Sequence, residues 1–315
     1  MLAGPALALL LSAAPAAPAP GPAATAHDPA IAAAVAGALR TAPGGTRASA
    51  ATRPLLGAPY LPSPLGEGAG PDPDPRFRLD AFDCMTFVET AVALGSARTL
   101  AEAARALDDV RYASAPALSG RNHEVLSQWI PSNVAKGWIA DVGAAVAGGS
   151  ARRETKTFSA ESWAAVRAAG RAIPGLPRSR LPVGVFAIDV VAPGDVDAAA
   201  ARLPEGTIAF VVRTDQPDRA TRITHAGIVV RGARGGVRVR HATSSKGVGR
   251  VIEEPIARFV LREERAYPRW PLAGLAFFEI RANGDRVRSL APGGAHPAAR
   301  TTGGGAVVSP RPSPL

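Results

Sequence analysis

The spacing of apolar residues changes half-way along the chain, and this change restricts the fold more than any other feature of the sequence. Before the change, apolar residues recur at helical spacing. After it, β-branched or aromatic runs are separated by Gly, Pro and Asp, at residues 183–188, 207–212, 225–230, 237–242 and 275–280. Such runs are typical of strands. Helices followed by strands predict an α+β fold rather than alternating βαβ units.

The N-terminal half is predicted to contain several helices around one long loop. Residues 42–80 are rich in Pro and Gly, which argues against regular structure and predicts a loop. Loops of that length inside a domain are usually functional or disordered. Helical patterns occur at residues 27–41, 83–95, 99–110 and 159–170, and a broken helical pattern covers residues 121–149. The first half of the domain is therefore expected to be helical.

The two ends of the chain differ in composition from the rest. Residues 1–26 contain a short apolar stretch followed by small residues, prolines and several A-x-A sites, which predicts a secretory signal peptide and a periplasmic or extracellular protein. The missing basic n-region leaves a mis-assigned start codon or an Ala-rich tail as alternatives. Residues 286–315 are rich in Gly, Pro, Ala and Ser and are predicted to be disordered. No apolar run reaches the roughly 20 residues that a membrane-spanning helix needs, so stable membrane insertion is not expected.

The chain is basic, with 36 Lys and Arg against 26 Asp and Glu and a net charge of +10. A charge of this sign favours contact with polyanions such as nucleic acid, anionic lipid headgroups or the anionic cell wall. No basic run with interleaved aromatic residues occurs, so nucleic acid is not an expected partner.

Cys84 is the only cysteine of the chain, which excludes an internal disulfide. Asp83 is a good N-cap residue and an apolar helical stripe follows it, so Cys84 is predicted at the first position of a helix. Unpaired N–H groups and the helix dipole favour a thiolate there, so the pKa of the thiol is expected to be lowered. The pattern indicates a nucleophile at the edge of a cleft, and a small buried hydrophobe is the alternative.

A cysteine nucleophile needs a base, and usually a third polar group that orients the base. The chain has five histidines, at His27, His123, His225, His241 and His296, of which the first and last fall beside the leader and in the tail. Gly235 and Gly236 predict a hairpin, which would bring His225 and His241 to the same end of neighbouring strands. Gly227 would allow another backbone or a ligand to approach closely. This pair is the candidate base and orienting group, although each histidine alone is more often structural.

Short motifs occur in a fixed order along the chain: GAPY (57–60), FDCMTFVE (82–89), RNHEVLSQWIPSN (121–133), THAGIVV (224–230) and HATSS (241–245). In this order they resemble the N-acetylmuramoyl-L-alanine amidase-like branch of the NlpC-type papain-like cell-wall hydrolases, over about residues 50–280. The resemblance implies an α+β, papain-like NlpC-type core in which the nucleophile helix packs on an antiparallel sheet. A single catalytic domain would then cover residues 27–285, with a large helical insertion at about residues 95–205.

The resemblance also implies roles for individual residues. Cys84 would be the nucleophile, His225 the base and His241 the third member of the site. Tyr60 would border the site and bind substrate or the oxyanion, or alternatively pack on the core. The candidate substrate-binding residues in the segment particular to this branch are Arg121, His123, Trp129 and Asn133. For His123, a structural role is the alternative.

The implied reaction is hydrolysis of the amide bond between N-acetylmuramic acid and L-alanine in (anhydro)muropeptides, the peptidoglycan fragments expected as partners. No cofactor is implied, and the lone cysteine and scattered histidines lack the spacing of a zinc site, so no metal is expected. Trp129, Trp138 and Trp163 would either offer a surface to a sugar ring or build the core of the insertion. The alternative functions are a D-glutamyl-diamino acid stem-peptide endopeptidase, a papain-like acyltransferase and an inactive wall-binding module.

Overall fold

The computed structural model describes residues 28–171 and 176–292. The predicted signal peptide, residues 1–26, lies outside these residues, as does most of the predicted disordered tail. In the described part of the chain, no helix is both long enough and apolar enough to cross a lipid bilayer.

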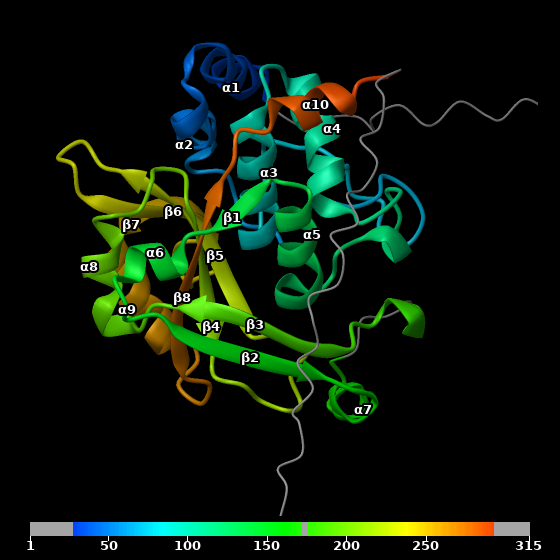
Figure 1. Ribbon diagram of the computed structural model, residues 1–315. Coiled ribbons are helices and arrows are strands. Elements are labelled where there is room, and N and C mark those ends of the chain that lie inside the picture. Colours follow the sequence, from blue (N-terminus) through cyan, green and yellow to red (C-terminus); the bar gives the residue numbers. More distant parts are fainter. Residues whose placement is uncertain (1–27, 172–175, 293–315) are drawn as a thin grey trace, which may run out of the picture.

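A six-stranded antiparallel sheet forms the centre of the fold, with the strand order β1-β8-β4-β5-β6-β7 (Figure 1). Its strands are β1 (Ile139–Asp141), β4 (Ile208–Arg213), β5 (Ile223–Arg231), β6 (Val237–Thr243), β7 (Arg250–Pro255) and β8 (Leu272–Ile280). All neighbouring strands pair antiparallel. The prediction of an antiparallel sheet in a fold with many helices is therefore confirmed, and β4, β5, β6 and β8 coincide with predicted strand runs.

A separate two-stranded ribbon pairs β2 (Arg152–Phe158) with β3 (Gly184–Val190) (Figure 1). β3 coincides with the remaining predicted run, whereas β2 is missed by the sequence pattern. Only Lys156 and Phe158 of β2 are buried, so its sequence RRETKTF shows no apolar alternation. The segment at residues 95–205, expected as a large helical insertion, contains helices and also supplies β1, β2 and β3.

Helices cover both faces of the main sheet (Figure 1). One side carries α1 (Pro29–Thr41), α2 (Arg47–Thr52), α3 (Cys84–Ser96), α4 (Leu100–Arg111), α5 (Ile130–Ala135) and α10 (Gly284–Ser289). The other side carries α6 (Gly143–Ala147), α8 (Val196–Ala200) and α9 (Ile256–Ala266), while α7 (Ala160–Ala168) packs on the ribbon. Short helical turns are η1 (Gly44–Thr46), η2 (Arg53–Leu55), η3 (Leu118–Gly120), η4 (Val125–Trp129), η5 (Arg178–Arg180) and η6 (Pro193–Asp195).

Regular structure extends into two segments for which the sequence predicts none. The expected loop at residues 42–80 contains α2, and Ala48 and Ala51 of this helix are buried where it packs against α3. Tertiary packing therefore outweighs the breaking effect of the nearby Pro and Gly. Helix α10 crosses residue 286, where the disordered tail was expected to begin, and the side chain of Asn283 caps it.

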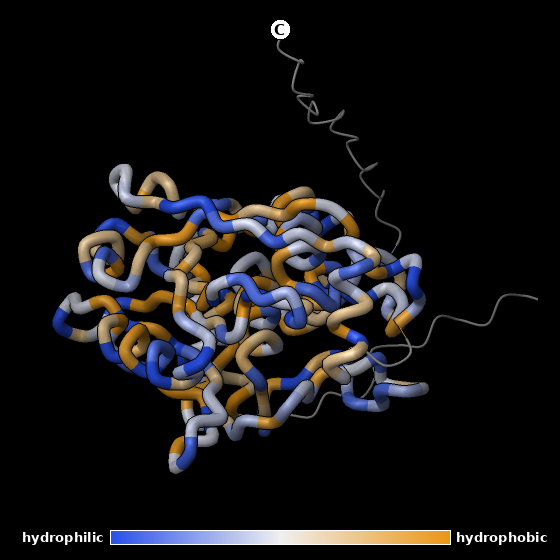
Figure 2. The backbone as a smooth tube through the Cα atoms, turned by 90° about the horizontal axis from the view of Figure 1, so that it is seen from below, coloured by the Kyte–Doolittle hydropathy of each residue, from blue (hydrophilic) through white to orange (hydrophobic). Residues whose placement is uncertain are grey.

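The two faces of the sheet carry separate parts of the core, because side chains alternate along each strand. Phe210 and Val212 of β4 belong to the cluster that includes α3, whereas Ala209 and Val211 belong to the cluster that includes α9. In Figure 2, apolar (orange) and polar (blue) residues follow one another closely along the backbone. Helix α3 packs against β5 and β6 and is buried from Thr86 to Ser96, so core packing holds its N-terminal end in place.

Replacing Phe210 with Ala should lower the free energy of unfolding by about 3–5 kcal/mol. The ring is completely buried and meets Trp129 and Phe278 edge-to-face, at centroid distances of 5.9 and 5.8 Å. Urea unfolding followed by circular dichroism measures the change. Val183→Ala is the control, because Val183 is 73% exposed and its loss should cost less than about 0.5 kcal/mol. Equal stability of the two variants would contradict this placement of the core.

Candidate active site

Cys84 occupies the first position of α3, as the sequence predicts. The carboxylate of Asp83 accepts a hydrogen bond from the backbone N–H of Thr86 (2.7 Å), and the Thr86 hydroxyl accepts one from the N–H of Asp83 (2.9 Å). Asp83 also accepts from the N–H of Ser63 (3.0 Å), which ties the preceding loop to the helix. This reciprocal capping holds the start of the helix, and with it the thiol, in one position.

His225 and His241 lie side by side on β5 and β6. Nε2 of His225 is 2.7 Å from Nδ1 of His241, and Nε2 of His241 is 3.1 Å from Oε1 of Glu254 on β7. Arg262 of α9 donates two hydrogen bonds to the same carboxylate, at 2.7 and 2.9 Å. The predicted proximity of the two histidines is therefore confirmed. We refer to His225, His241 and Glu254 as the relay.

The carboxylate of Glu254, at the end of the relay, determines which nitrogen of each histidine carries a proton. Burial raises the pKa of Glu254, but hydrogen bonds from His241 and Arg262 outweigh it and bring the pKa down to about 2. The ionised carboxylate can only accept, so Nε2 of His241 carries a proton. A neutral imidazole has one N–H, so Nδ1 of His241 accepts from Nε2 of His225. This network assigns the free lone pair of His225 to Nδ1.

Both imidazoles are neutral near pH 7. Burial, followed by the proximity of His241 and the charge of Arg262, lowers the pKa of His225 well below its ordinary value of 6.5. Burial also lowers the pKa of His241, by more than its hydrogen bond to Glu254 raises it. The ring of Phe259 packs against both imidazoles, at centroid distances of 5.7 and 5.0 Å. A neutral His225 with a free Nδ1 is able to accept a proton.

Gly227 lets β5 and β6 approach each other where the histidines meet. A Cβ atom at this position would lie 2.7 Å from a methyl of Val239 and 2.8 Å from both the carbonyl oxygen of Arg240 and Cβ of His241. Any side chain here would therefore push β6, and with it His241, away from β5. The sequence-based expectation of a close backbone approach at Gly227 is confirmed.

The thiol of Cys84 is half-buried and is not poised as a thiolate. Burial and the charge of Asp83 raise its pKa to about 12, with a further increase from Glu263, while backbone hydrogen bonds from Ala226 and Met85 oppose the shift. The prediction of a lowered pKa at the helix start is therefore wrong. Desolvation and two nearby carboxylates outweigh the effect of the helix dipole.

Cys84 approaches β5 at Ala226, the residue next to the candidate base. Helix α3 packs against β5, and the backbone of Ala226 hydrogen-bonds the sulfur. Among residues 28–171 and 176–292, no hydrogen bond joins Sγ of Cys84 directly to a ring nitrogen of His225. The structure thus brings a neutral thiol next to the strand that carries a neutral imidazole.

Tyr60 pairs through its backbone with Phe82, two residues before Cys84, and so lies near the start of α3. Its pKa is raised by burial and then by the charges of Cys84 and Asp83, and a hydrogen bond with Ser244 acts in the opposite direction. The backbone N–H of Tyr60 donates to the carbonyl oxygen of Gly249 at 2.9 Å. Tyr60 therefore stands at the border of the candidate site, and its role with a substrate stays a prediction.

A cavity of about 260 Å³ adjoins the start of α3. Its lining includes Asp83, Met85, Glu89, Arg121, His123 and Trp129. Arg121 already donates to the carboxylates of Glu67 (2.6 Å) and Asp72 (2.9 Å). Nε2 of His123 lies 2.7 Å from the carbonyl oxygen of Leu118. Three of the predicted substrate-binding residues thus border a cavity beside the nucleophile helix, but the charge of Arg121 is already matched inside the protein.

Asn133 does not line this cavity. Its side chain is completely buried, and its amide donates to the carbonyl oxygens of Val110 (3.0 Å) and Trp129 (2.9 Å). The structure therefore contradicts the prediction of a substrate contact at Asn133. The residue instead ties α5 to the end of α4.

The tryptophans of the insertion are buried, with exposed fractions of 1% for Trp129, 0% for Trp138 and 4% for Trp163. Each indole N–H donates a hydrogen bond inside the protein. Trp129 donates to Glu89, Trp138 to Asp109, and Trp163 to the carbonyl oxygen of Pro182. Of the two alternatives left by the sequence, core building is the one observed. None of the three offers a free ring face for a sugar.

Sequence reasoning missed the carboxylates around the site. Glu254 sets the protonation of the relay, and Glu263 forms a buried ion pair with Arg213 at 3.1 Å, where burial raises the pKa of Glu263 to about 7. A signal for Glu263 was present, because it continues the apolar helix face of Ile256, Phe259 and Val260.

In the part of the chain that the structure describes, no group of His, Cys, Asp and Glu side chains is gathered as metal ligands would be.

A family model described as N-acetylmuramoyl-L-alanine amidase-like matches residues 50–266, the range that contains Cys84 and the relay. The chain belongs to this amidase-like family. No curated protein sequence matches the chain.

Two proteins with solved structures are similar in fold to this amidase-like protein. A Legionella pneumophila protein of the family DUF1460 is 19% identical, with a TM-score of 0.66 over 80% of this chain and 93% of that one. An N-acetylmuramoyl-L-alanine amidase from Bacteroides uniformis is 18% identical, with a TM-score of 0.54 over 78% of this chain and 99% of that one. At these identities the likeness shows the fold alone.

The raised pKa of Cys84 predicts slow alkylation near neutral pH. Since almost all of the thiol is protonated, the rate with iodoacetamide should rise about tenfold per pH unit from pH 7 to 10, without the plateau near pH 8.5 of an ordinary cysteine. Mass spectrometry reads the reaction directly, because the chain has one cysteine. Glu263→Gln removes a negative charge and should speed alkylation above pH 7, where Glu263 is ionised. A plateau at or below pH 10 would contradict the raised pKa of Cys84.

Proposed function

We propose that this protein is a cysteine amidohydrolase that cleaves the amide bond between N-acetylmuramic acid and L-alanine in (anhydro)muropeptides. The observation that carries the proposal is that a neutral His225 has a free Nδ1. Its ring is oriented by His241 and Glu254, and it lies on β5, the strand that Cys84 contacts. Membership of the amidase-like family supports the substrate class. We place the protein in the NlpC-type papain-like superfamily on the strength of its motifs and of this arrangement.

In the first step, Sγ of Cys84 attacks the carbonyl carbon of the amide and its proton passes to Nδ1 of His225. The transfer accompanies the attack, because a thiol with a pKa of about 12 does not ionise beforehand near pH 7. The electron pair of the C=O π bond moves to the oxygen and gives a tetrahedral oxyanion. The backbone N–H of Cys84 and the hydroxyl of Tyr60 are the candidate donors to this oxygen.

The tetrahedral intermediate then collapses to a thioester. The C–N bond breaks, and His225 returns its proton to the departing nitrogen of L-alanine. A water molecule, deprotonated by Nδ1 of His225, attacks the thioester and releases the lactyl carboxylate and the thiol. While His225 is an imidazolium, its Nε2–H donates a hydrogen bond to His241, and His241 donates one to the carboxylate of Glu254. This chain of hydrogen bonds to a negative charge stabilises the imidazolium.

The masses of the products identify the bond that is cut. Incubation of a disaccharide-peptide should release the free disaccharide and a stem peptide with an N-terminal L-alanine, much faster than intact sacculi are cut. Cys84→Ala should lower the rate by at least about 1,000-fold with little change in thermal unfolding, because it removes one half-buried sulfur atom. Cleavage after D-glutamate, or rapid cleavage of a sugar-free stem peptide, would replace the amidase proposal with the endopeptidase.

The two histidines should differ in effect. His225→Ala should be nearly as severe as Cys84→Ala, and His241→Ala milder, because an orienting group contributes less than the base that it orients. In the wild type, kcat/KM should fall on the acid side only below pH 6.5, since the base must be neutral and burial lowers the pKa of His225. Near wild-type rates for both variants across pH 5–9 would show that the catalytic site lies elsewhere.

A further inference from the structure

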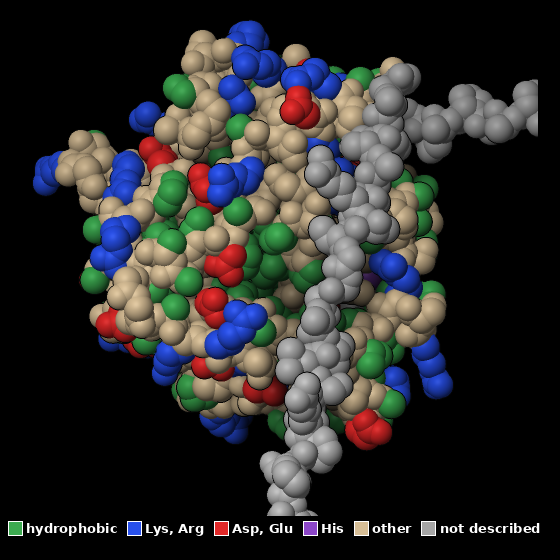
Figure 3. All heavy atoms as spheres, in the orientation of Figure 1, with side chains coloured by type: hydrophobic (Ala, Val, Ile, Leu, Met, Phe, Trp, Pro, Cys, Tyr) green, Lys and Arg blue, Asp and Glu red, His purple; other side chains and the backbone are tan. Residues whose placement is uncertain are grey.

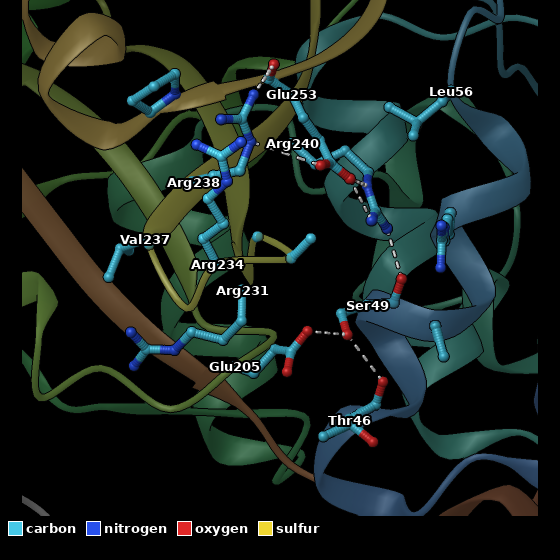
Figure 4. Close-up of a pocket in the computed structure, with 16 residues that line it drawn as sticks. Thr46, Ser49, Leu56, Glu205, Arg231, Arg234, Val237, Arg238, Arg240 and Glu253 are labelled. Atoms are coloured by element: carbon cyan, nitrogen blue, oxygen red, sulfur yellow. Dashed lines mark hydrogen bonds and ion pairs between the residues drawn. The ribbon is translucent and has the colours of Figure 1, made fainter.

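A second cleft runs from the turn of the β5–β6 hairpin to Arg240 and Glu253, which are the neighbours of His241 and Glu254 in sequence. Side chains alternate along a strand, so Arg240 points towards α2, on the opposite face of the sheet from His241. The cleft has a volume of about 920 Å³ and lies between the hairpin and the segment formed by α2 and η2 (Figure 4). Neither Cys84 nor any member of the relay lines it. The cleft is therefore separate from the candidate active site.

The charged residues that line this cleft are mostly arginines: Arg53, Arg231, Arg234, Arg238 and Arg240, with Glu205 and Glu253. On the face drawn in Figure 3, by contrast, Lys and Arg side chains (blue) are interspersed with Asp and Glu side chains (red). The cleft concentrates an excess of three positive charges in a concave space. Such a concentration attracts anions, because a low-dielectric wall focuses the field.

Internal contacts build the floor of the cleft. Arg240 is only 4% exposed, pairs with Glu253, and donates to the carbonyl oxygen of Ser49 (2.5 Å) and to the hydroxyl of Thr52 (2.6 Å). These bonds join the hairpin wall to α2. The hydroxyl of Ser49 donates to the carboxylate of Glu205 at 2.7 Å (Figure 4). The two walls are thus held at a set separation before any ligand enters.

Other arginines leave guanidinium groups for a ligand. Arg238 donates to the backbone carbonyl of Glu253 (2.9 Å), which uses part of its hydrogen-bonding capacity. Arg53 and Arg234 are exposed and form no ion pair with any residue of the described ranges. Arg53 belongs to η2 and Arg234 to the hairpin turn, so they come from the two different walls. Each guanidinium can bind a carboxylate or phosphate through two parallel hydrogen bonds.

The remaining lining decides what kind of anion fits. Among the described residues that line the cleft, none is Phe, Tyr or Trp, so a nucleobase would find no ring on which to stack. Oε1 of Glu205 already accepts from Ser49, and Oε1 of Glu253 from Arg240. The remaining lone pairs of these two carboxylates can accept hydrogen bonds from hydroxyl groups of a ligand but not from a second anion. The volume lies within the range of small-molecule sites. We infer that this cleft binds an acidic saccharide, a sugar that carries a carboxylate or phosphate group together with free hydroxyls.

Isothermal titration calorimetry on the full-length protein tests this site independently of the proposed hydrolysis. The probes are N-acetylmuramic acid, N-acetylglucosamine 6-phosphate, neutral N-acetylglucosamine and inorganic phosphate. At least one acidic sugar should bind about tenfold or more tightly than both the neutral sugar and inorganic phosphate. The two acidic sugars distinguish a carboxylate ligand from a phosphate ligand. Added NaCl should weaken the binding.

Variants assign the binding to the cleft. The double variant Arg53→Ala/Arg234→Ala should bind the acidic sugar about tenfold or more weakly. Arg167→Ala/Arg178→Ala is the matched control, since it removes the same charge from two exposed arginines that do not line the cleft. All four side chains are exposed, so thermal unfolding should not change.

Three results would overturn the inference. The first is failure of both acidic sugars to bind more tightly than the neutral sugar or inorganic phosphate. The second is an equal loss of affinity in the cleft variant and in the control variant. The third is tighter binding of a short single-stranded oligonucleotide than of either acidic sugar, which would show that the ligand is not a saccharide.

Discussion

Glu254 is the constraint on which the rest of the candidate site depends. An ionised carboxylate in the interior is costly unless its oxygens are hydrogen-bonded, and here Arg262 and His241 supply those bonds. Because the carboxylate can only accept, it determines where each imidazole holds its proton and which nitrogen of His225 is free. The base is therefore prepared by a group that does not touch it, through a second histidine. The close strand approach at Gly227 is what allows this chain of contacts to form.

Burial has opposite chemical consequences at the two ends of the proposed catalytic pair. Desolvation disfavours the charged form of any group, so it raises the pKa of the Cys84 thiol and lowers that of the His225 imidazole. Both shifts oppose a preformed thiolate–imidazolium pair. In the proposed mechanism, charge separates only during the attack. The thiol proton then moves to His225, and negative charge develops on the substrate oxygen. Proton transfer and attack are thereby coupled, and the resting thiol is weakly nucleophilic.

Buried ion pairs hold the helices around the site in position. Arg213 on β4 pairs with Glu263 on α9, and Arg111 on α4 pairs with Glu89 on α3. Pairs this deeply buried add little net stability, because desolvation offsets their attraction, but loss of one partner leaves an uncompensated charge. They therefore act mainly by restricting where α9 can sit on β4 and where α3 can sit against α4. The cationic cleft uses the same device, since the buried Arg240 pairs with Glu253 and also donates to Ser49 and Thr52 of the opposite wall.

Local patterns in the sequence determined the elements that carry the site. The cap at Asp83 and the turn at Gly235 act within a few residues, so the start of α3 and the pairing of the two histidines could be predicted. Strands β2 and β7 could not, because their buried polar residues, Lys156 and Glu254, find their partners in other elements of the fold. The export signal and the bond cleaved stay predictions. Tertiary structure alone decided that Cys84 is a neutral thiol, that Glu254 ends the relay and that Asn133 is buried. The reason is that desolvation and contacts between elements depend on which segments pack together and not on residue type.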